Sequence, residues 1–198
     1  LLEKSIIIRT ADHGEAGLSH GLRQKAYTAY EEMIHVPLII SNPILFPTSK
    51  ITDSMYSHLD LFPTILDLCG GIKKYGKGKS ILPIIKNPGI SIQDSVLFCY
   101  DDVIPGLNSE IPSSHIRAIR KGNYTYAIYF SPLQLTYEYE MYDLSSDPLQ
   151  LTNLLHNEAS ISGELKNIAS ELDDELRNKI TENEALPLFT IWPENKWK

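Results

Sequence analysis

Three consecutive isoleucines, Ile6 to Ile8, stand almost at the start of this 198-residue chain and constrain its fold more than any other feature. A run of β-branched residues without alternating polar positions is typical of a strand that is buried on both faces. A second apolar run, 36–40, follows a segment at 24–33 that is expected to be helical. Two strands that flank a helix predict a parallel βαβ unit, so the first part of the chain is expected to be α/β.

The first strand, expected over residues 4–10, has no helix or long loop before it. Domains seldom open on a central strand, and we therefore expect this chain to be the C-terminal part of a longer protein. The N-terminal half would then carry part of any active site. Residues 1–5 lack the basic and apolar regions of a signal peptide, so they are not interpreted as one.

Composition excludes several classes of partner. Eighteen Lys and Arg against 25 Asp and Glu give a net charge of −7, which argues against nucleic acid because phosphate backbones require a basic face. No apolar run approaches the roughly 20 residues of a membrane span. Cys69 and Cys99 cannot build a disulfide framework and leave the compartment open, so localisation is not predicted.

Further along, the chain changes from helical to alternating patterns. Asp60 is expected to cap a helix that Gly70-Gly71 ends. The loop Gly76-Lys77-Gly78-Lys79 fits neither register of a phosphate-binding loop and is expected to be a solvated basic loop. Strands are then expected at 95–100, 115–120, 124–130 and 137–144, with a hairpin turn at 121–123. An amphipathic helix at 161–180 follows, with the charged run 171–175 on its solvated face.

The chemistry-bearing residues gather after the first strand. Asp12 and His13 follow it directly, where a sharp turn could aim a carboxylate and an imidazole at one point as half of a metal shell. Lys25 offers a compact positive charge suited to an anionic oxygen, and His20 lies between. Taken singly, these residues are better explained as a turn-capping Asp, an exposed His and a surface lysine, and none of them identifies a reaction.

The spacing of the whole block resembles the sulfatase family. The matching residues are Thr10-Ala11-Asp12-His13-Gly14-Glu15, Leu18-Ser19-His20-Gly21-Leu22, Lys25, Tyr30-Glu31-Glu32, Val36-Pro37-Leu38-Ile39-Ile40 and Asp60 to Leu68. Arg117-Ala118-Ile119-Arg120 and Met141 to Pro148 with Asn153-Leu154 resemble the closing signatures of that family. The resemblance is dense over 6–72 and patchier over 95–155.

The resemblance implies an α/β fold: part of a mixed sheet flanked by helices, followed by a small four-stranded antiparallel sheet with a C-terminal helix. It implies residues 1–91 as the C-terminal part of the catalytic domain and 92–198 as the smaller subdomain. In the family, the residues at Asp12 and His13 bind a divalent cation and the residue at Lys25 binds the sulfate. His20 matches a histidine common in this block, to which we assign a role near the substrate.

The family nucleophile is a formylglycine made from Cys or Ser in a Cys/Ser-x-Pro/Ala-x-Arg motif. Neither Cys69 nor Cys99 stands in such a motif, so the nucleophile is expected in the missing N-terminal half and this chain alone is expected to be inactive. The resemblance to the family implies calcium as the bound cation, and calcium prefers oxygen ligands. The imidazole of His13 instead favours manganese or zinc.

Three functions fit the sequence. The first is a sulfuric ester hydrolase acting on a sulfate ester, with this chain as its C-terminal portion. The second is a metal-dependent phosphodiesterase or phosphonate monoester hydrolase of the same alkaline-phosphatase-like superfamily. The third is a non-catalytic fragment that binds a partner through an exposed sheet edge. The alcohol part of the substrate and the oligomeric state are not encoded in any motif seen here.

Overall fold

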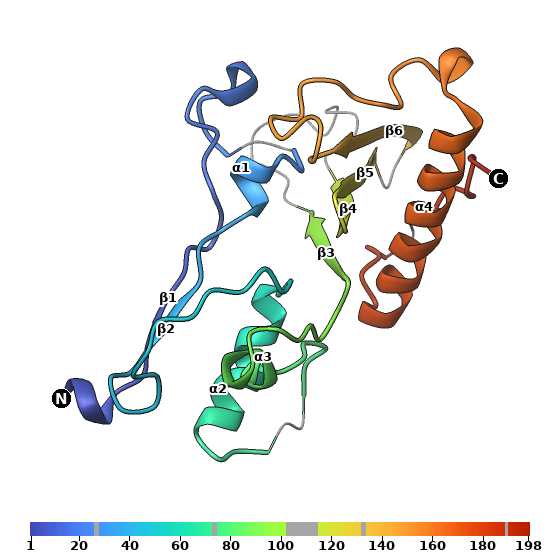
Figure 1. Ribbon diagram of the computed structural model, residues 1–198. Coiled ribbons are helices and arrows are strands. Elements are labelled where there is room, and N and C mark those ends of the chain that lie inside the picture. Colours follow the sequence, from blue (N-terminus) through green and yellow to red (C-terminus); the bar gives the residue numbers. More distant parts are fainter. Residues whose placement is uncertain (26–27, 73–74, 102–114, 132–133, 189) are drawn as a thin grey trace. The chain divides into compact units, whose positions relative to one another are not determined.

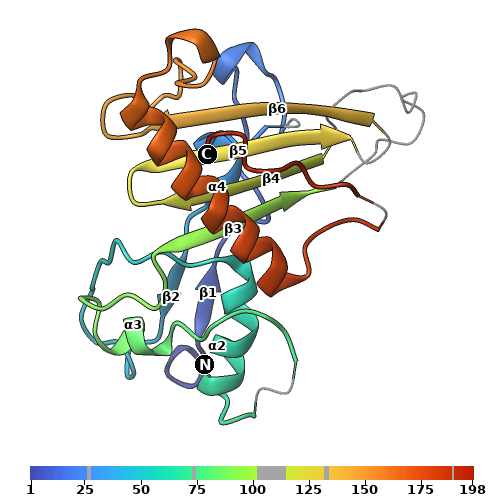
Figure 2. The same ribbon diagram turned by 90° about the vertical axis from the view of Figure 1, so that its right-hand side faces the viewer.

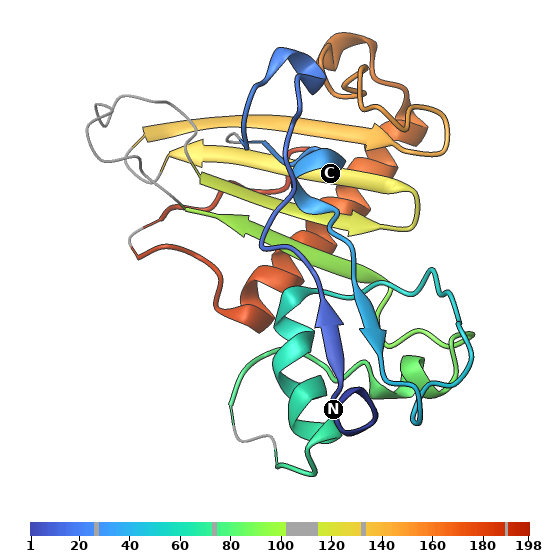
Figure 3. The same ribbon diagram turned by 90° about the vertical axis from the view of Figure 1, so that its left-hand side faces the viewer.

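The computed structural model describes residues 1–25, 28–72, 75–101, 115–131, 134–188 and 190–198 (Figures 1, 2 and 3). The chain divides into two compact units, residues 1–53 and 54–198. Residues 54–91 therefore group with the sheet that follows them. The domain boundary expected after residue 91 stays a prediction.

The first unit contains a two-stranded antiparallel sheet. Strand β1 (Ile7–Arg9) pairs with β2 (Ile39–Ser41), with Ile8 opposite Ile40. Short 3-10 helices cover Leu2–Lys4 and Ser19–Gly21, and helix α1 spans Glu31–Ile34. Buried Asn42 connects the segments before β1 and after β2. Its amide group donates to the carbonyl of Ser5, and its Oδ1 accepts the N–H groups of Ile44 and Leu45.

Three expectations for this unit were wrong. The strands are antiparallel instead of parallel, and Ile7 and Ile8 are half-buried instead of covered on both faces. Helix α1 begins only at Glu31, whereas the described residues of 24–30 are not helical. Aromatic and β-branched residues in that segment lose side-chain freedom in a helix, which lowers its helix propensity.

The second unit contains the four-stranded antiparallel sheet that the sequence predicts. Its strands are β3 (Ser95–Tyr100), β4 (His115–Lys121), β5 (Tyr124–Ser131) and β6 (Gln134–Asp143), and they follow one another in that order. A tight turn with Gly122 at φ +55° joins β4 to β5, as expected. Helices α2 (Leu61–Leu68) and α3 (Leu82–Lys86) precede the sheet, 3-10 helices cover His58–Asp60 and Glu158–Ser160, and α4 (Gly163–Asn183) follows.

Helix α4 lies across one face of this sheet and builds the core of the unit (Figures 1 and 2). Residues of β4, β5 and β6 on this face pack against the apolar stripe of the helix, and consecutive residues of β4 and β5 are buried. The cluster of buried residues consists of Ile119, Tyr126, Ile128, Met141, Leu155, Ala169, Leu172, Leu176, Ile180 and Trp197. The C-terminal tail thus packs into the core through Trp197.

A buried polar network sits inside this core. The hydroxyl of Tyr126 donates to Asp173 Oδ1 at 2.9 Å and accepts from Trp197 Nε1 at 3.0 Å. Arg177 forms an ion pair with the other carboxylate oxygen of Asp173. Asp173 is only 1% exposed, so its assignment to the solvated face of the helix was wrong. Burial raises the pKa of Asp173. The buried carboxylate is tolerated because it is paired with Arg177 and hydrogen-bonded to Tyr126.

This network predicts a loss of stability at high pH. Burial, followed by the charge of Asp173, raises the pKa of Tyr139 to about 12 and raises the pKa of Tyr126 further. A raised phenol pKa contributes stability that is complete below the unfolded value near 10 and is lost as pH rises through the folded value. We expect the free energy of unfolding to fall between about pH 10 and 12, and Tyr139→Phe to weaken that dependence. Urea unfolding at several pH values measures it, and an unchanged slope in Tyr139→Phe contradicts it.

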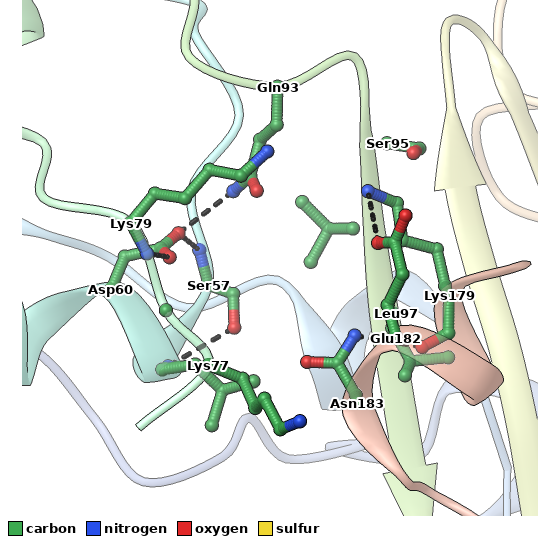
Figure 4. Close-up of a pocket in the computed structure, with 13 residues that line it drawn as sticks. Ser57, Asp60, Lys77, Lys79, Gln93, Ser95, Leu97, Lys179, Glu182 and Asn183 are labelled. Atoms are coloured by element: carbon green, nitrogen blue, oxygen red, sulfur yellow. Dashed lines mark hydrogen bonds and ion pairs between the residues drawn. The ribbon is translucent and has the colours of Figure 1, made fainter. Parts of the chain in front are cut away.

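Asp60 organises the start of the second unit in a way that the sequence did not predict. Its side chain does not cap α2; it accepts the N–H of Ser57 at 2.8 Å, the backbone N–H of Lys79 at 2.7 Å and the amide of Gln93 at 2.8 Å (Figure 4). Gly78 packs so closely that an added Cβ would lie 1.9 Å from the carbonyl oxygen of Leu59. The loop at 76–79 is therefore docked on Asp60 and is not simply solvated.

A buried arginine in β4 forms an ion pair with the residue that follows β3. Arg117 of β4 is 1% exposed and forms two hydrogen bonds with Asp101, at 2.7 and 2.8 Å. The guanidinium also donates to the carbonyl groups of Ile116 and Ala185. Neighbouring His115 is partly desolvated, and burial lowers its pKa. Asp101, which follows the last residue of β3, is therefore a structural ion-pair partner.

Candidate functional site

The candidate site begins three residues after β1, at Asp12. One oxygen of its carboxylate accepts the backbone N–H of His13 at 3.0 Å, and 87% of the side chain is exposed. That hydrogen bond, followed by the charge of His13, lowers the pKa of Asp12. The carboxylate is therefore ionised and open to solvent, which suits a metal ligand.

His13 presents one ring nitrogen to the same place. Its Nδ1 lies 2.6 Å from the carbonyl oxygen of Gly14. Because a carbonyl can only accept, Nδ1 carries a proton, and in the neutral tautomer Nε2 then keeps a lone pair for a metal. Nε2 lies 3.5 Å from Asp12 Oδ2. A hydrogen bond of this kind to the second nitrogen is the usual way in which proteins orient a metal-binding histidine.

Gly14 fixes this turn against the start of α1. Its N–H donates to the carbonyl of Met33 at 2.8 Å, and an added Cβ would lie 1.8 Å from the carbonyl oxygen of Glu32. No side chain fits between two backbones at that distance, so glycine is required. The backbone contact determines where the Asp12-His13 turn is held within the first unit.

Lys25 lies on the loop that follows and is exposed. Its ammonium group is within electrostatic range of Asp12, because its charge makes a small contribution to lowering the pKa of that carboxyl. Asp12, His13 and Lys25 all belong to the first unit. Within the part of the chain that the structure describes, no three His, Cys, Asp or Glu side chains gather as a metal site, so Asp12 and His13 form at most half of a shell.

His20 occupies a different environment. Its backbone adopts φ +52° within the turn Ser19–Gly21, and its ring stacks on Tyr30 with centroids 3.7 Å apart and planes at 5°. The side chain is 12% exposed, and Nε2 lies 4.0 Å from the carboxylate of Glu32. Ser19 donates to the other oxygen of Glu32 at 2.6 Å. No local sequence pattern indicates this cluster, because the residues that contact each other lie ten to thirteen positions apart.

A separate cavity of about 90 Å³ lies in the second unit (Figure 4). Its polar lining comes from Ser57, Asp60, Lys77, Lys79, Gln93 and Lys179, among others. The Asp60 carboxylate already accepts three hydrogen bonds there, and Lys77 is paired with Glu184. None of the predicted site residues lines this cavity. Its polar groups hold the fold of the unit together.

Comparisons with known proteins agree with the resemblance. The family model of the C-terminal region of N-sulphoglucosamine sulphohydrolase matches residues 18–182, a region that includes His20 and Lys25. Arylsulfatase K of Rattus norvegicus is 31% identical over 185 residues, which cover 91% of this chain and 30% of that protein. Choline-sulfatase of Rhizobium meliloti (strain 1021) is 31% identical over 162 residues, which cover 79% of this chain and 28% of that protein.

Solved structures show the same fold. A 2-O GAG sulfatase is 26% identical with a TM-score of 0.73, over 92% of this chain and 37% of that one. A protein solved in complex with its substrate D-glucosamine-2-N,6-O-disulfate has a TM-score of 0.70 at 23% identity, over 92% of this chain and 35% of that one. The chain thus spans about a third of the length of these proteins. Among the described residues, no helix is long and apolar enough to cross a membrane.

Proposed function

The chain belongs to the sulfatase family, in the C-terminal region of its members, and we propose that it supplies one side of the active site of a sulfuric ester hydrolase. The named relatives are sulfatases, which supports a sulfate ester as the substrate. The observation that carries the proposal is the convergence of Asp12 Oδ2 and His13 Nε2 within 3.5 Å of each other on an exposed turn, within electrostatic range of Lys25.

Each of these residues has a distinct task in the proposed site. Asp12 contributes a negative oxygen ligand, and His13 contributes Nε2 while its Nδ1–H on the carbonyl of Gly14 holds the ring in place. Lys25 places an ammonium group at the sulfate oxygens, where a preorganised charge stabilises the transition state. The remaining metal ligands and the formylglycine nucleophile would come from the region of the relatives that this chain does not cover.

The chemistry of the donors constrains the ion. A divalent cation bound here would neutralise charge on the sulfate as a Lewis acid. The family implies calcium, and the oxygen of Asp12 suits it, whereas the nitrogen of His13 also suits manganese or zinc. We propose calcium. Metal analysis of the purified full-length protein decides, and stoichiometric zinc or manganese would replace calcium in the proposal.

Replacing Lys25 tests the proposed function. In the full-length protein, Lys25→Ala is expected to lower kcat/KM for an aryl sulfate by about 100-fold, because the transition state loses a preorganised charge. Bound metal should stay at the wild-type level, since Lys25 is not a ligand. Lys4→Ala, which removes another exposed lysine of the first unit, is the matched control and should leave kcat/KM unchanged.

Competing substrates separate the remaining functions. Preferential turnover of a phosphodiester or a phosphonate monoester would assign the site to phosphoryl chemistry of the same superfamily. Loss of aryl sulfate turnover on treatment with a chelator, and its return with the divalent cation, is the result expected for the sulfatase. If the full-length protein hydrolyses none of these esters with metal present, the remaining hypothesis is a non-catalytic protein that binds a partner.

A further inference from the structure

We propose that Glu32 is a positioning residue for Lys25, acting through a clamp that closes the loop between residues 19 and 32; this inference rests on the function proposed above. The clamp consists of Ser19, His20, Tyr30 and Glu32. It lies wholly within the first unit and uses none of the side chains assigned to the metal or the sulfate.

The clamp joins the two ends of the loop that carries Lys25. At one end, Ser19 donates to Glu32 Oε1 at 2.6 Å, and the ring of His20 stacks on Tyr30 at 3.7 Å. Glu32 Oε2 lies 4.0 Å from His20 Nε2, a buried atom with no hydrogen-bond partner among the described residues. Both oxygens of one carboxylate therefore face the turn Ser19–Gly21 from the first turn of α1.

Closing this loop is what the side chain of Glu32 contributes. A chain segment loses conformational entropy when its ends are fixed, so the contacts that fix the two ends limit how far Lys25 can move. The Asp12-His13 turn is held differently, by the backbone hydrogen bond from Gly14 to Met33. Removing the carboxylate of Glu32 should release Lys25 and leave the metal ligands in place.

The experiment compares substitutions within the full-length protein. Glu32→Ala is expected to lower kcat/KM for an aryl sulfate by about tenfold with wild-type metal content, because displacing a charged group by an ångström is costly in catalysis. Glu32→Gln keeps an oxygen that accepts from Ser19 and should recover most of the loss. Ser19→Ala should resemble Glu32→Ala and remains informative if the latter folds poorly. Glu31→Gln is the matched control, since Glu31 pairs with exposed His35.

A double-mutant cycle tests whether the effect passes through Lys25. In the Lys25→Ala background, Glu32→Ala should have little further effect on kcat/KM, because there is no ammonium left to misplace. If the two losses multiply, Glu32 does not act through Lys25 and the inference fails. A structural role alone would lower the thermal midpoint and leave the losses independent.

Hydrogen exchange supplies a readout that needs no turnover. Amides of residues 19–25 should exchange faster in Glu32→Ala and Ser19→Ala than in wild type or Glu31→Gln, because the clamp protects that segment. Equal exchange in all four proteins overturns the clamp. If the wild-type protein hydrolyses no sulfate ester, the proposed function fails, and the exchange rates still decide whether the clamp exists.

Discussion

Replacing Asp12 by asparagine is expected to lower turnover of the full-length enzyme by roughly 100-fold or more and to reduce bound metal in parallel. The substitution removes one negative charge and one acceptor oxygen from the proposed metal shell. The amide oxygen can still accept the N–H of His13, which keeps the turn, and the side chain is 87% exposed. The free energy of unfolding should therefore stay within about 0.5 kcal/mol of wild type. Metal analysis, steady-state kinetics and urea unfolding of one preparation measure all three quantities.

The control for this substitution is Asp53→Asn, which makes the same chemical change at another exposed aspartate of the first unit. It should leave metal content and turnover unchanged. Wild-type metal content in Asp12→Asn would remove Asp12 from the metal shell. A drop in turnover with full metal occupancy would instead assign Asp12 to the substrate.

Local patterns predicted the second unit well. Alternating residues predicted all four strands of the sheet, and Gly122 marked the turn between β4 and β5. The helix expected at 161–180 is α4, and Gly70 ends α2 with φ +71°, as expected. These features depend on residues that are close in sequence, so periodicity and turn chemistry contain enough information to identify them.

The errors arose where distant residues determine the structure. Asp60 is a favourable N-cap by residue type, yet Lys79 and Gln93 supply donors that a local reading cannot see. A helix between two apolar runs suggested parallel strands, but α1 begins at Glu31 and has four residues, and β2 returns antiparallel to β1. Buried Asp173 of α4 likewise depends on Tyr126, which lies far away in the sequence in strand β5.

The candidate site shows the same difference between features that depend on neighbouring residues and features that depend on distant ones. Adjacent Asp12 and His13 could be recognised because one turn holds both, and the family block added Lys25. The clamp of Ser19, His20, Tyr30 and Glu32 could not, because it exists only once the loop has closed. His20, predicted to act near the substrate, has its ring against Tyr30 and its Nε2 toward Glu32, which favours positioning over contact with substrate. Its catalytic role stays a prediction.

Removing the carboxylate of Asp101 is expected to cost about 3 kcal/mol of unfolding free energy. Arg117 is 1% exposed, and Asp101→Ala leaves its guanidinium buried without a counter-charge. The side chain of Asp101 is 44% exposed, but the guanidinium that it pairs with is buried. Deleting the partner of a buried charge costs more than the net value of the pair, because the remaining charge stays desolvated. The bonds from Arg117 to the carbonyls of Ile116 and Ala185 compensate only in part. Urea unfolding monitored by circular dichroism measures the loss.

Deleting the second charge as well should restore stability. In the double variant Asp101→Ala with Arg117→Met, an apolar chain of similar length replaces the guanidinium beside Phe130. No unpaired buried charge then remains at this position. We expect the double variant to be more stable than Asp101→Ala alone. Asp94→Ala is the control. The side chain of Asp94 is 79% exposed, and its Oδ2 lies 3.9 Å from Lys121 Nζ, so this surface pair is worth at most about 1 kcal/mol. A double variant less stable than the single one would mean that Arg117 stabilises the sheet through its carbonyl contacts and not through its charge.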